Sequence, residues 1–404
     1  MNKSILHLDL DTFFVSVERL LNSELLKKPV LVGGTGNRGV VAACSYETRR
    51  YGIRSGISMK MARQLCPQAI VIRGNAGTYM KYSSLITDII RDSVPLFEKT
   101  SVDEFYVDLT GMDRFFGNYK FATELRKRII NESGLPISFG LSQNKIVSKV
   151  ATGEAKPNNQ LKIDQGFEKS FLAPLPIRKI PMIGKATAQT LIHLGIDKVK
   201  LIQDMPVEML TSVMGKNGQT IWNRANGIDN TPVIPYSERK SISNERTFHL
   251  DTIDVQKLRD TLTAMADTLC YQLRLGKKMT GCVSVKIRYS DFQTYNKQIR
   301  IPYTSADHIL VPAVMELFNN LYDRRVLVRL IGVKFSHLVG GHYQINLFDD
   351  NEKTLNLYKS LDHIRNRFGA TSVLKASTLD VRTVISGRNP FDGEPPVLLA
   401  HRNQ

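Results

Sequence analysis

Cysteine is scarce in this sequence, and long apolar runs are absent from it. The 404 residues include four cysteines, Cys44, Cys66, Cys270 and Cys282, and no two of them form a Cys-x-x-Cys pair. A disulfide framework or a zinc knuckle is therefore not expected, whereas a reducing, cytoplasmic environment is. The sequence has no 18-residue apolar run, lipidation signal or secretory start, which predicts a protein that neither crosses nor attaches to a membrane.

Acidic residues are outnumbered by basic ones. The chain has 38 Asp and Glu against 55 Lys and Arg, a formal net charge of +17 at pH 7. Such an excess informs about partners rather than fold, and nucleic acid is a common partner of a large basic protein. The hydrophobic fraction of 42% and charged fraction of 23% are ordinary globular values. The length suggests about two to four domains.

Helical and strand-like patterns are mixed over about the first 160 residues, which predicts an α/β layered domain. Strands are expected at 5–10, 29–32, 39–43, 97–102, 104–109 and 137–142, and helices near 58–66, 75–93 and 116–132.

The remainder divides into a helical segment, a linker and a second mixed unit. Residues 165–232 have helical spacing, and the proline-bearing residues 231–240 predict a linker. From 241 to 340 the expected order is strand, helix, two strands, helix and strand, typical of a split βαβ sandwich. A helix is expected at 352–368, followed by a poorly ordered tail at 387–404.

Carboxylates stand at the ends of two predicted strands. Asp9 ends the first strand, and Asp103 and Glu104 are neighbours inside a β-prone run. Taken separately, Asp9 could form an ion pair, Asp11 could cap the next helix, and the adjacent pair could lie in a solvated turn. Together, Asp9, Asp103 and Glu104 supply hard oxygen ligands, which suit Mg²⁺ rather than Zn²⁺. Because strand neighbours face opposite sides, the adjacent pair can reach one site only at a bend or strand end.

Three further residues have the chemistry to hold phosphate. Tyr46 and Arg49 are three positions apart, so they share one face if the segment is helical. Arginine can fork onto phosphate oxygens, and tyrosine adds a hydroxyl donor. Lys156 ends a predicted helix just before Pro157. The plainer alternatives are an exposed basic helix for the first two residues and a helix-capping lysine for the third.

Four segments together resemble the motifs of Y-family translesion DNA polymerases. They are Asp-Leu-Asp-Thr-Phe-Phe (9–14), Ser-Tyr-Glu-Thr-Arg (45–49), Ser-Val-Asp-Glu-Phe-Tyr-Val-Asp-Leu-Thr (101–110) and Ala-Lys-Pro-Asn (155–158). Residues 46–49 and 52–56 resemble the bacterial DNA polymerase IV branch of this family in particular. The motif order and spacing agree over about residues 4–340.

The resemblance implies a multidomain α+β and α/β fold, the right hand of a polymerase. Its parts would be a palm (1–10 and 74–165), small fingers (11–73), a helical thumb with a helix-hairpin-helix (166–232), a linker (233–240), a DNA-binding βαββαβ little finger (241–340) and a clamp-binding peptide, helix and tail (341–404). The implied partners are primer–template DNA, a deoxynucleoside triphosphate and a sliding clamp, and we expect a monomer.

The resemblance also assigns catalytic roles. Asp9, Asp103 and Glu104 would be the catalytic residues and would bind two Mg²⁺ ions, with the backbone carbonyl of Leu10 as a further ligand. The implied reaction is attack of a primer 3′-hydroxyl on the α-phosphate of the nucleotide.

Nucleotide-binding roles follow in the same way. Tyr46, Arg49 and Lys156 would hold the incoming triphosphate. Phe14 would be the steric gate that excludes a ribose 2′-hydroxyl, and Phe13 would pack beside it. From the residues alone, both are simply aromatic side chains that begin an amphipathic helix. The short fingers segment, with small residues before Tyr46, would press weakly on a nascent base pair and so predicts low fidelity.

DNA contacts are implied in two places. Gly184 and Lys185 belong to the helix-hairpin-helix, whose backbone amides would grip a DNA phosphate. The family usually has Gly-x-Gly there, whereas this chain has Met182 at the first position. Lys286 and Arg288 would project from one strand face toward the DNA, with a solvated strand face as the alternative.

Residues 344–348, Gln-Ile-Asn-Leu-Phe, resemble the peptide by which bacterial polymerases bind the sliding clamp. Gln344 would bond at a pocket rim while Leu347 and Phe348 fill an apolar pocket. In many polymerase IV chains this peptide ends the protein, whereas here it does not, a placement more like the catalytic subunit of DNA polymerase V. The alternative is that Leu347 and Phe348 pack onto the C-terminal helix.

Two other classes of function remain open at this point. Residues 9–12 also match the nucleophile motif of haloacid-dehalogenase-type phosphatases, in which Asp9 would be phosphorylated and Asp11 would act as acid and base. The third possibility is a non-catalytic scaffold that binds DNA or the clamp.

Overall fold

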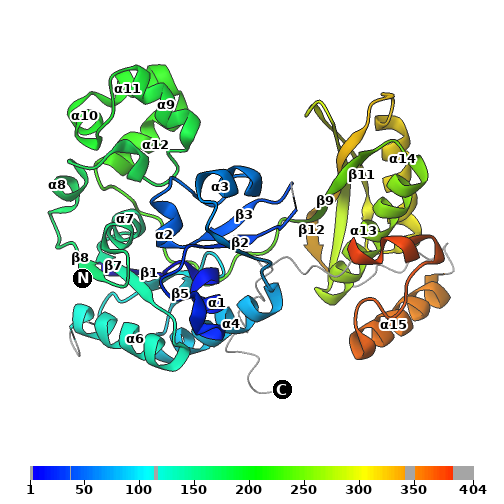
Figure 1. Ribbon diagram of the computed structural model, residues 1–404, viewed down its shortest axis with the longest axis horizontal. Helices are drawn as coiled ribbons and strands as arrows, with labels where there is room; N and C mark the ends of the chain where they lie inside the picture. Colours follow the sequence, from blue (N-terminus) through cyan, green and yellow to red (C-terminus); the bar gives the residue numbers. More distant parts are fainter. Residues whose placement is uncertain (1–2, 37, 113–116, 342–350, 385–404) are drawn as a thin grey trace. The chain divides into compact units, whose positions relative to one another are not determined.

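The computed structural model describes residues 3–36, 38–112, 117–341 and 351–384 (Figure 1). The chain divides between Ser237 and Glu238 into two units, each with its own core. Residues 228–240, all of them described, form neither helix nor strand.

A five-stranded sheet forms the centre of the first unit. Its strand order is β5 (Phe97–Lys99), β6 (Glu104–Asp108), β1 (Ile5–Leu10), β7 (Ile137–Ser142) and β8 (Gln160–Lys162). The middle strand β1 pairs antiparallel with both β6 and β7, and β8 runs parallel to β7. The strand predicted at 97–102 is therefore too long, because the backbone bends at 101–103 before β6 begins.

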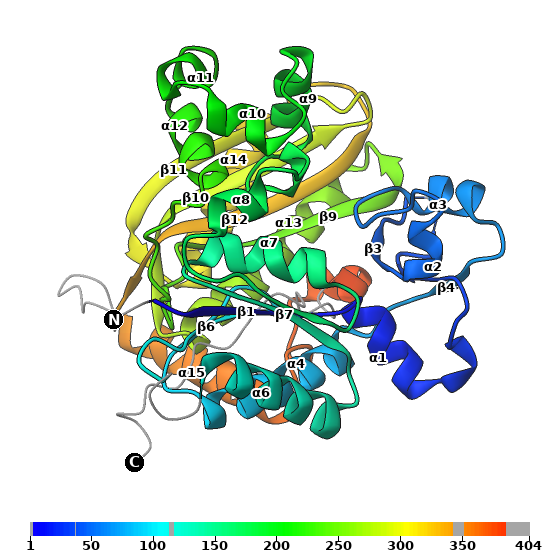
Figure 2. The ribbon, with the colours of Figure 1, turned by 90° about the vertical axis from the view of Figure 1, so that its left-hand side faces the viewer.

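Helices cover both faces of this sheet. Figure 2 shows α4 (Ala76–Ser93) and α6 (Asn118–Ser133) below it and α7 (Lys145–Ala155) above it. Strand alternation sends Leu6 and Leu8 of β1 into the apolar core with α4 and α6. The intervening residues, His7 and Asp9, face α7 and bond to residues of that helix and its end. The polar face of β1 thus carries the first candidate carboxylate.

A three-stranded sheet of order β3-β2-β4 follows the first helix. It consists of β2 (Val30–Gly33), β3 (Val41–Cys44) and β4 (Ile70–Ile72). The helices of this segment are α1 (Phe13–Leu21), η1 (Ser23–Leu25), α2 (Tyr46–Arg49) and α3 (Met59–Leu65). Its own small core forms around Leu31, Val41 and Met59. The short helix α2 begins directly after β3, so the sheet positions Tyr46 and Arg49.

The predicted helical segment is present. It contains α8 (Glu168–Leu172), η2 (Ile177–Lys179), α9 (Lys185–His193), α10 (Val199–Asp204), α11 (Val207–Met214) and α12 (Lys216–Ala225). Val147, Val150 and Ala151 of α7 share its core, so this segment packs on the same helix that covers the five-stranded sheet.

The second unit has the predicted order of strand, helix, two strands, helix and strand. These elements are β9 (Ser241–Thr252), α13 (Val255–Leu275), β10 (Lys278–Tyr289), β11 (Thr294–Thr304), α14 (Asp307–Leu321) and β12 (Val328–Gly340). The strands form an antiparallel sheet of order β11-β10-β12-β9. The predicted C-terminal helix is α15 (Asn351–Phe368), and η3 (Ala376–Val384) follows it.

Candidate active site

The three candidate carboxylates lie at neighbouring strand ends. Asp9 of β1 is the register partner of Glu104, which begins β6. Asp103 lies in the bend just before β6, and its carbonyl accepts a 3.1 Å hydrogen bond from the amide of Leu10. The bend allows the adjacent side chains of Asp103 and Glu104 to serve one region, as the strand geometry requires.

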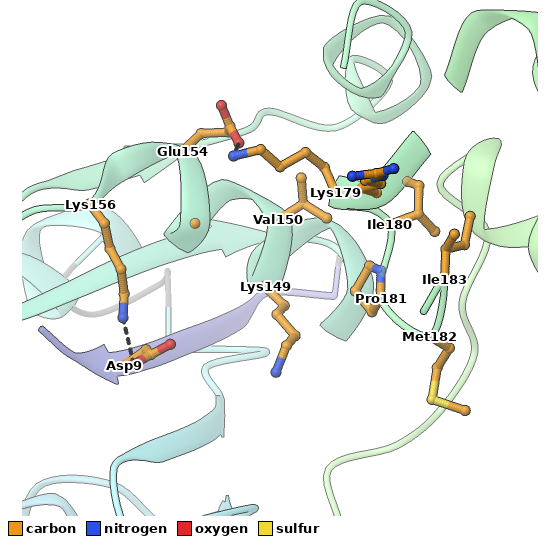
Figure 3. A pocket seen from close by; sticks show the side chains of 12 residues that line it. Asp9, Lys149, Val150, Glu154, Lys156, Lys179, Ile180, Pro181, Met182 and Ile183 are labelled. Carbon is orange, nitrogen blue, oxygen red and sulfur yellow. Dashed lines mark ion pairs between the residues drawn. The ribbon is translucent and has the colours of Figure 1, made fainter. Parts of the chain in front are cut away.

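Lysines from the middle and the C-terminal end of α7 form ion pairs with two of these carboxylates. The Nζ atom of Lys156 lies 2.6 Å from Oδ1 of Asp9, an ion pair that Figure 3 shows, and 3.4 Å from the carbonyl oxygen of Leu10. Lys149 donates to Oε1 of Glu104. Lys156 is the C-cap residue of α7, in agreement with the helix-capping alternative, and its ammonium group also reaches β1. The alternative of an ion pair for Asp9 is present in this structure.

A buried histidine, His7, forms a hydrogen bond with Glu104. The Nε2 atom of His7 lies 2.6 Å from Oε1 of Glu104, and its Nδ1 atom lies 2.7 Å from the hydroxyl of Thr152 on α7. Burial lowers the pKa of His7. Burial alone would raise the pKa of Glu104, but the hydrogen bonds from His7 and Lys149 outweigh it and lower that pKa to about 2. Glu104 is therefore ionised throughout the physiological range.

Asp103 has the opposite electrostatic balance. Burial raises its pKa, and the neighbouring charge of Asp9 raises it further, while the hydrogen bond from Ser101 and the charge of Lys156 act against that rise. Neighbouring carboxylates repel each other unless a cation lies between them. A positive charge beside Asp103 would therefore favour its ionised form.

Asp11 ties three segments together. It is 1% exposed, and its oxygens accept hydrogen bonds from the Tyr46 hydroxyl at 3.1 Å, the Ser138 hydroxyl at 2.8 Å and the Asn158 amide at 2.7 Å. The alternative that Asp11 caps the next helix is wrong, because α1 begins after Thr12 without a side-chain cap. Sequence reasoning missed the true role, because these partners come from distant segments.

Tyr46 and Arg49 form one cluster on α2. The Arg49 guanidinium lies 4.8 Å from the centroid of the Tyr46 ring, and its Nε atom is buried without a hydrogen-bond partner among the described residues. Burial and the nearby charge of Asp11 raise the pKa of Tyr46, so its hydroxyl stays protonated. The alternative of an exposed basic helix is wrong. An unpartnered guanidinium nitrogen is a donor available to an anionic ligand.

Phe13 and Phe14 differ in environment. Phe13 is 3% exposed and belongs to the core, whereas Phe14 is partly buried and stacks on Tyr79, with ring centroids 4.2 Å apart. The Tyr79 hydroxyl in turn donates to Glu18 of the same helix as Phe14. Tyr79 was not identified from the sequence, because it lies on α4 in an ordinary amphipathic pattern.

A cavity of about 360 Å³ lies beside Asp9, one of the three candidate carboxylates. Asp9, Lys149 and Lys156 line one side of it, and residues 178–183, which connect η2 to α9, line the other. Figure 3 shows the Lys156 side chain reaching Asp9, whereas the Lys149 side chain does not point at Asp9. The site therefore opens toward the predicted helix-hairpin-helix.

The turn of that hairpin carries backbone strain. Gly184 caps α9 and Lys185 begins it, both exposed. Met182 is 81% exposed and has a φ of 74° in the left-handed region, which favours glycine. The glycine of the Gly-x-Gly pattern is therefore the residue that this backbone would prefer at position 182.

Known proteins match this chain in sequence and in fold. The sequence matches the impB/mucB/samB family over residues 8–153, the C-terminal domain of that family over 239–347 and the HHH motif of the IMS family over 168–196. The chain belongs to the impB/mucB/samB family.

Relatives in this family cover nearly the whole chain. DNA polymerase IV of Dehalococcoides mccartyi is 40% identical over 380 residues, which are 93% of this chain and 97% of that protein. DNA polymerase IV of Clostridium acetobutylicum is 33% identical over 393 residues, 94% and 99% of the two chains. The predicted resemblance to the polymerase IV branch is confirmed.

Solved structures confirm the predicted right-hand fold. A Y-family DNA polymerase chimera of Dbh and Dpo4 matches with a TM-score of 0.73 and 26% identity, over 84% of this chain and 100% of the chimera. DinB from Sulfolobus solfataricus matches over the same shares with a TM-score of 0.59 and 25% identity.

The donor set of this impB/mucB/samB chain suits a divalent cation, although its side chains are not gathered around one. No group of three or more His, Cys, Asp or Glu in the described part of the chain is close enough to hold a metal ion. The fit rests on chemistry: Asp9, Glu104 and the Leu10 carbonyl are hard oxygen donors, and the ammonium of Lys156 already lies between two of them.

The remaining predicted site residues lie either in the second unit or outside the described residues. Lys286 forms an ion pair with Glu245, and Arg288 donates to the Thr294 hydroxyl at 2.8 Å. Both alternate with buried Val285 and Ile287 on β10, so they occupy its polar face. Gln344, Leu347 and Phe348 lie outside the described residues.

None of the described helices is long and apolar enough to span a membrane.

Proposed function

We propose that this chain performs low-fidelity, template-directed translesion synthesis, transferring nucleotides from deoxynucleoside triphosphates to a primer 3′-hydroxyl. Family membership makes it a DNA-directed DNA polymerase. The observation that supports the mechanism best is the meeting of Asp9, Asp103 and Glu104 at adjoining ends of β1 and β6, beside a cavity lined with lysines.

Asp9, Asp103, Glu104 and the Leu10 carbonyl would hold two Mg²⁺ ions. When bound, such ions lower the pKa of the primer hydroxyl and neutralise the leaving diphosphate. The protein holds the ligands in place through His7, which fixes Glu104, and through Ser101, which donates to Asp103. Lys149 pairs with Glu104 and Lys156 pairs with Asp9, and these ion pairs offset the negative charge of the two carboxylates.

Tyr46, Arg49 and Lys156 would bind the triphosphate. The buried and unpartnered Nε atom of Arg49 is a donor for a phosphate oxygen, and the ring of Tyr46 holds the guanidinium in place. Lys156 would release Asp9 and bind the phosphates instead. Its ammonium group would thus pair first with a carboxylate and then with a phosphate. The bonds of Asp11 to Tyr46 and Asn158 keep the segments that carry these donors together.

Phe14 would select the sugar. It stacks on Tyr79, whose hydroxyl donates a hydrogen bond to Glu18 of α1. This hydrogen bond holds the Tyr79 ring, and the Tyr79 ring in turn holds the ring of Phe14. The residues that lead to α2 are small: Ala42 and Ala43 of β3 are not buried. Small exposed residues press weakly on a nascent base pair, which supports low fidelity.

The division into palm, fingers, thumb and little finger is part of this proposal, as are DNA contacts at Gly184, Lys185, Lys286 and Arg288. We also propose clamp docking through Gln344, Leu347 and Phe348, a monomeric state and action in the cytoplasm. All four cysteines are buried thiols without disulfides, which supports a reducing compartment.

The geometry argues against the phosphatase alternative. That chemistry needs Asp11 as an accessible acid and base, but Asp11 is buried and its oxygens accept three hydrogen bonds within the fold. All three of these hydrogen bonds would have to break before a substrate could contact this carboxylate.

The test is primer extension on undamaged and abasic templates with Mg²⁺, with and without a sliding clamp. The proposal predicts extension on both templates, frequent misincorporation and greater product length with the clamp. Rapid hydrolysis of p-nitrophenyl phosphate without DNA, together with no primer extension, would contradict it.

A further inference from the structure

A partly buried lysine, Lys99, lies next to the bend that carries Asp103. Lys99 ends β5, and residues 100–103 connect that strand to β6. It is the register partner of Phe105, and its Nζ atom lies 5.5 Å from the centroid of the Phe105 ring. Phe105 and Ile86 of α4 belong to one apolar core, so the Lys99 side chain enters the sheet face that α4 covers.

The ammonium group of Lys99 bonds to two hydroxyls of α4. Its Nζ atom lies 2.8 Å from Oγ of Ser83 and 2.9 Å from Oγ1 of Thr87, and it forms no ion pair with a carboxylate of the described residues. Burial lowers the pKa of Lys99 to about 8, so the charged form is less favourable here than in water. An apolar side chain of similar length would fill the same space without that cost.

The two hydroxyls pass this bonding on to the backbone. The Ser83 hydroxyl donates to the carbonyl oxygen of Val102 at 2.6 Å, and the Thr87 hydroxyl donates to the carbonyl oxygen of Ser83 at 2.6 Å. A hydroxyl has one hydrogen, whereas an ammonium group can only donate. Lys99 therefore occupies an acceptor position on each hydroxyl and leaves the single hydrogen of Ser83 for Val102. The positive charge also makes the Ser83 hydroxyl a stronger donor.

Val102 immediately precedes Asp103, a candidate metal ligand. The Val102 carbonyl and the Asp103 amide form one peptide group, so a bond to that oxygen fixes the backbone on the N-terminal side of Asp103. On its C-terminal side, the Asp103 carbonyl accepts a 3.1 Å hydrogen bond from the amide of Leu10. The two peptide groups that flank Asp103 are thus anchored, one to α4 and the other to β1.

We propose that Lys99 is a positioning residue for Asp103 and acts through the Ser83 hydroxyl. It fixes the bend, so that the Asp103 carboxylate is presented in one orientation before a cation binds. Such preorganisation lowers the cost of ordering a ligand on binding. The inference rests on the proposed function for the purpose of the carboxylate, whereas the fixed bend is a property of the chain alone.

The first measurement is hydrogen–deuterium exchange of the full chain without metal, followed by mass spectrometry. Lys99→Met removes the donor and keeps the length of the side chain. The amides of residues 100–104 should exchange about tenfold faster in this variant, because the Ser83 hydroxyl can then turn away from Val102. Lys99→Arg keeps a cationic donor and should restore part of the protection. Equal exchange by Lys99→Met and the unchanged chain would overturn the proposal.

The second measurement is the Mg²⁺ concentration that gives half-maximal primer extension. Lys99→Met should raise it about threefold to tenfold and change the rate at saturating Mg²⁺ by less than about twofold, because Lys99 orients a ligand and takes no part in the chemistry. If the unchanged chain extends primers and Lys99→Met needs no more Mg²⁺ than it does, the proposal fails. Absence of extension by the unchanged chain contradicts the proposed function instead, and the exchange measurement still tests Lys99.

Lys145→Met is the matched control. Lys145 is also buried, and its Nζ atom lies 4.9 Å from the centroid of the Tyr106 ring, but it belongs to α7 on the other face of the sheet and pairs with Glu98. This variant loses an ammonium group of the same kind and should leave the exchange of residues 100–104 and the Mg²⁺ requirement unchanged. Equal changes in both variants would indicate a general loss of packing and refute the positioning role.

A double-mutant cycle tests the route through Ser83. Ser83→Ala removes the hydroxyl and should speed the same exchange. Adding Lys99→Met to it should then have little further effect, because the lysine acts through that hydroxyl. Additive effects of the two changes would exclude this route. Lys99→Gln, which removes the charge, carries the same predictions if Lys99→Met does not fold.

Discussion

The five-stranded sheet of the first unit and the four-stranded sheet of the second unit carry their charged residues in different places. In the first, His7 and Asp11 are buried at or near the end of β1, and each is bonded to groups from distant segments. In the second, Lys286 and Arg288 stand on the polar strand face, with a surface ion pair and a single hydrogen bond.

This difference predicts how each region responds to mutation. A buried charge depends on all of its partners, so that removing one group leaves others unsatisfied. Exposed charges on a strand face act additively through long-range attraction, and each is worth little alone. Changes near β1 should therefore abolish function or folding, whereas changes on β10 should have graded effects.

The largest effect is expected from Asp103→Ala. This change removes a predicted metal ligand, so primer extension should fall by more than about a thousandfold. Primer–template affinity, measured by fluorescence anisotropy, should be nearly unchanged, because DNA contacts are expected elsewhere. Retained synthesis would refute the metal assignment.

Asp11→Ala should mainly affect folding. It leaves the Asn158 amide and the Ser138 and Tyr46 hydroxyls without an acceptor, which should lower the free energy of unfolding by about 3 kcal/mol. Urea denaturation of the variant measures this loss. Glu154→Ala, which removes a partly exposed ion pair with Lys179, serves as a control and should cost less than about 1 kcal/mol.

Phe14→Ala should relax the choice of sugar. Without the large ring beside Tyr79, the ratio of deoxyribonucleotide to ribonucleotide incorporation should fall by about tenfold to a hundredfold. Single-nucleotide insertion kinetics with dCTP and CTP give this ratio. If it stays the same, another group excludes the 2′-hydroxyl.

The smallest effect is expected on the second sheet. Changing both Lys286 and Arg288 to Ala should weaken DNA binding severalfold and reduce the slope of log affinity against log salt by about two. Binding isotherms at several salt concentrations provide both values. An unchanged slope would show that these side chains face solvent in the complex as well.

Local sequence patterns predicted the elements well. The strand expected at 5–10 is β1 and the one at 137–142 is β7, while the helix expected at 75–93 differs from α4 by one residue. These patterns reflect burial on one face of an element, which each segment carries in its own residues.

The support of the candidate site could not be predicted in this way. The Asp11 carboxylate accepts a hydrogen bond from Asn158, and His7 contacts Thr152 and Glu104, all of them distant in sequence. Local sequence patterns do not predict which strand end packs against which helix. The residues alone indicated that Asp9, Asp103 and Glu104 could be hard oxygen ligands for Mg²⁺, whereas their catalytic roles were predicted from the resemblance of their motifs to those of a known family.

The central claim is that Asp9, Asp103 and Glu104 converge on divalent cations. Its most direct test is titration of the chain with Mn²⁺, followed by electron paramagnetic resonance in the presence of primer–template DNA and a non-hydrolysable nucleotide. The account predicts that two ions bind to the unchanged chain and that Asp103→Ala loses at least one of them. Equal binding by the two proteins would contradict it.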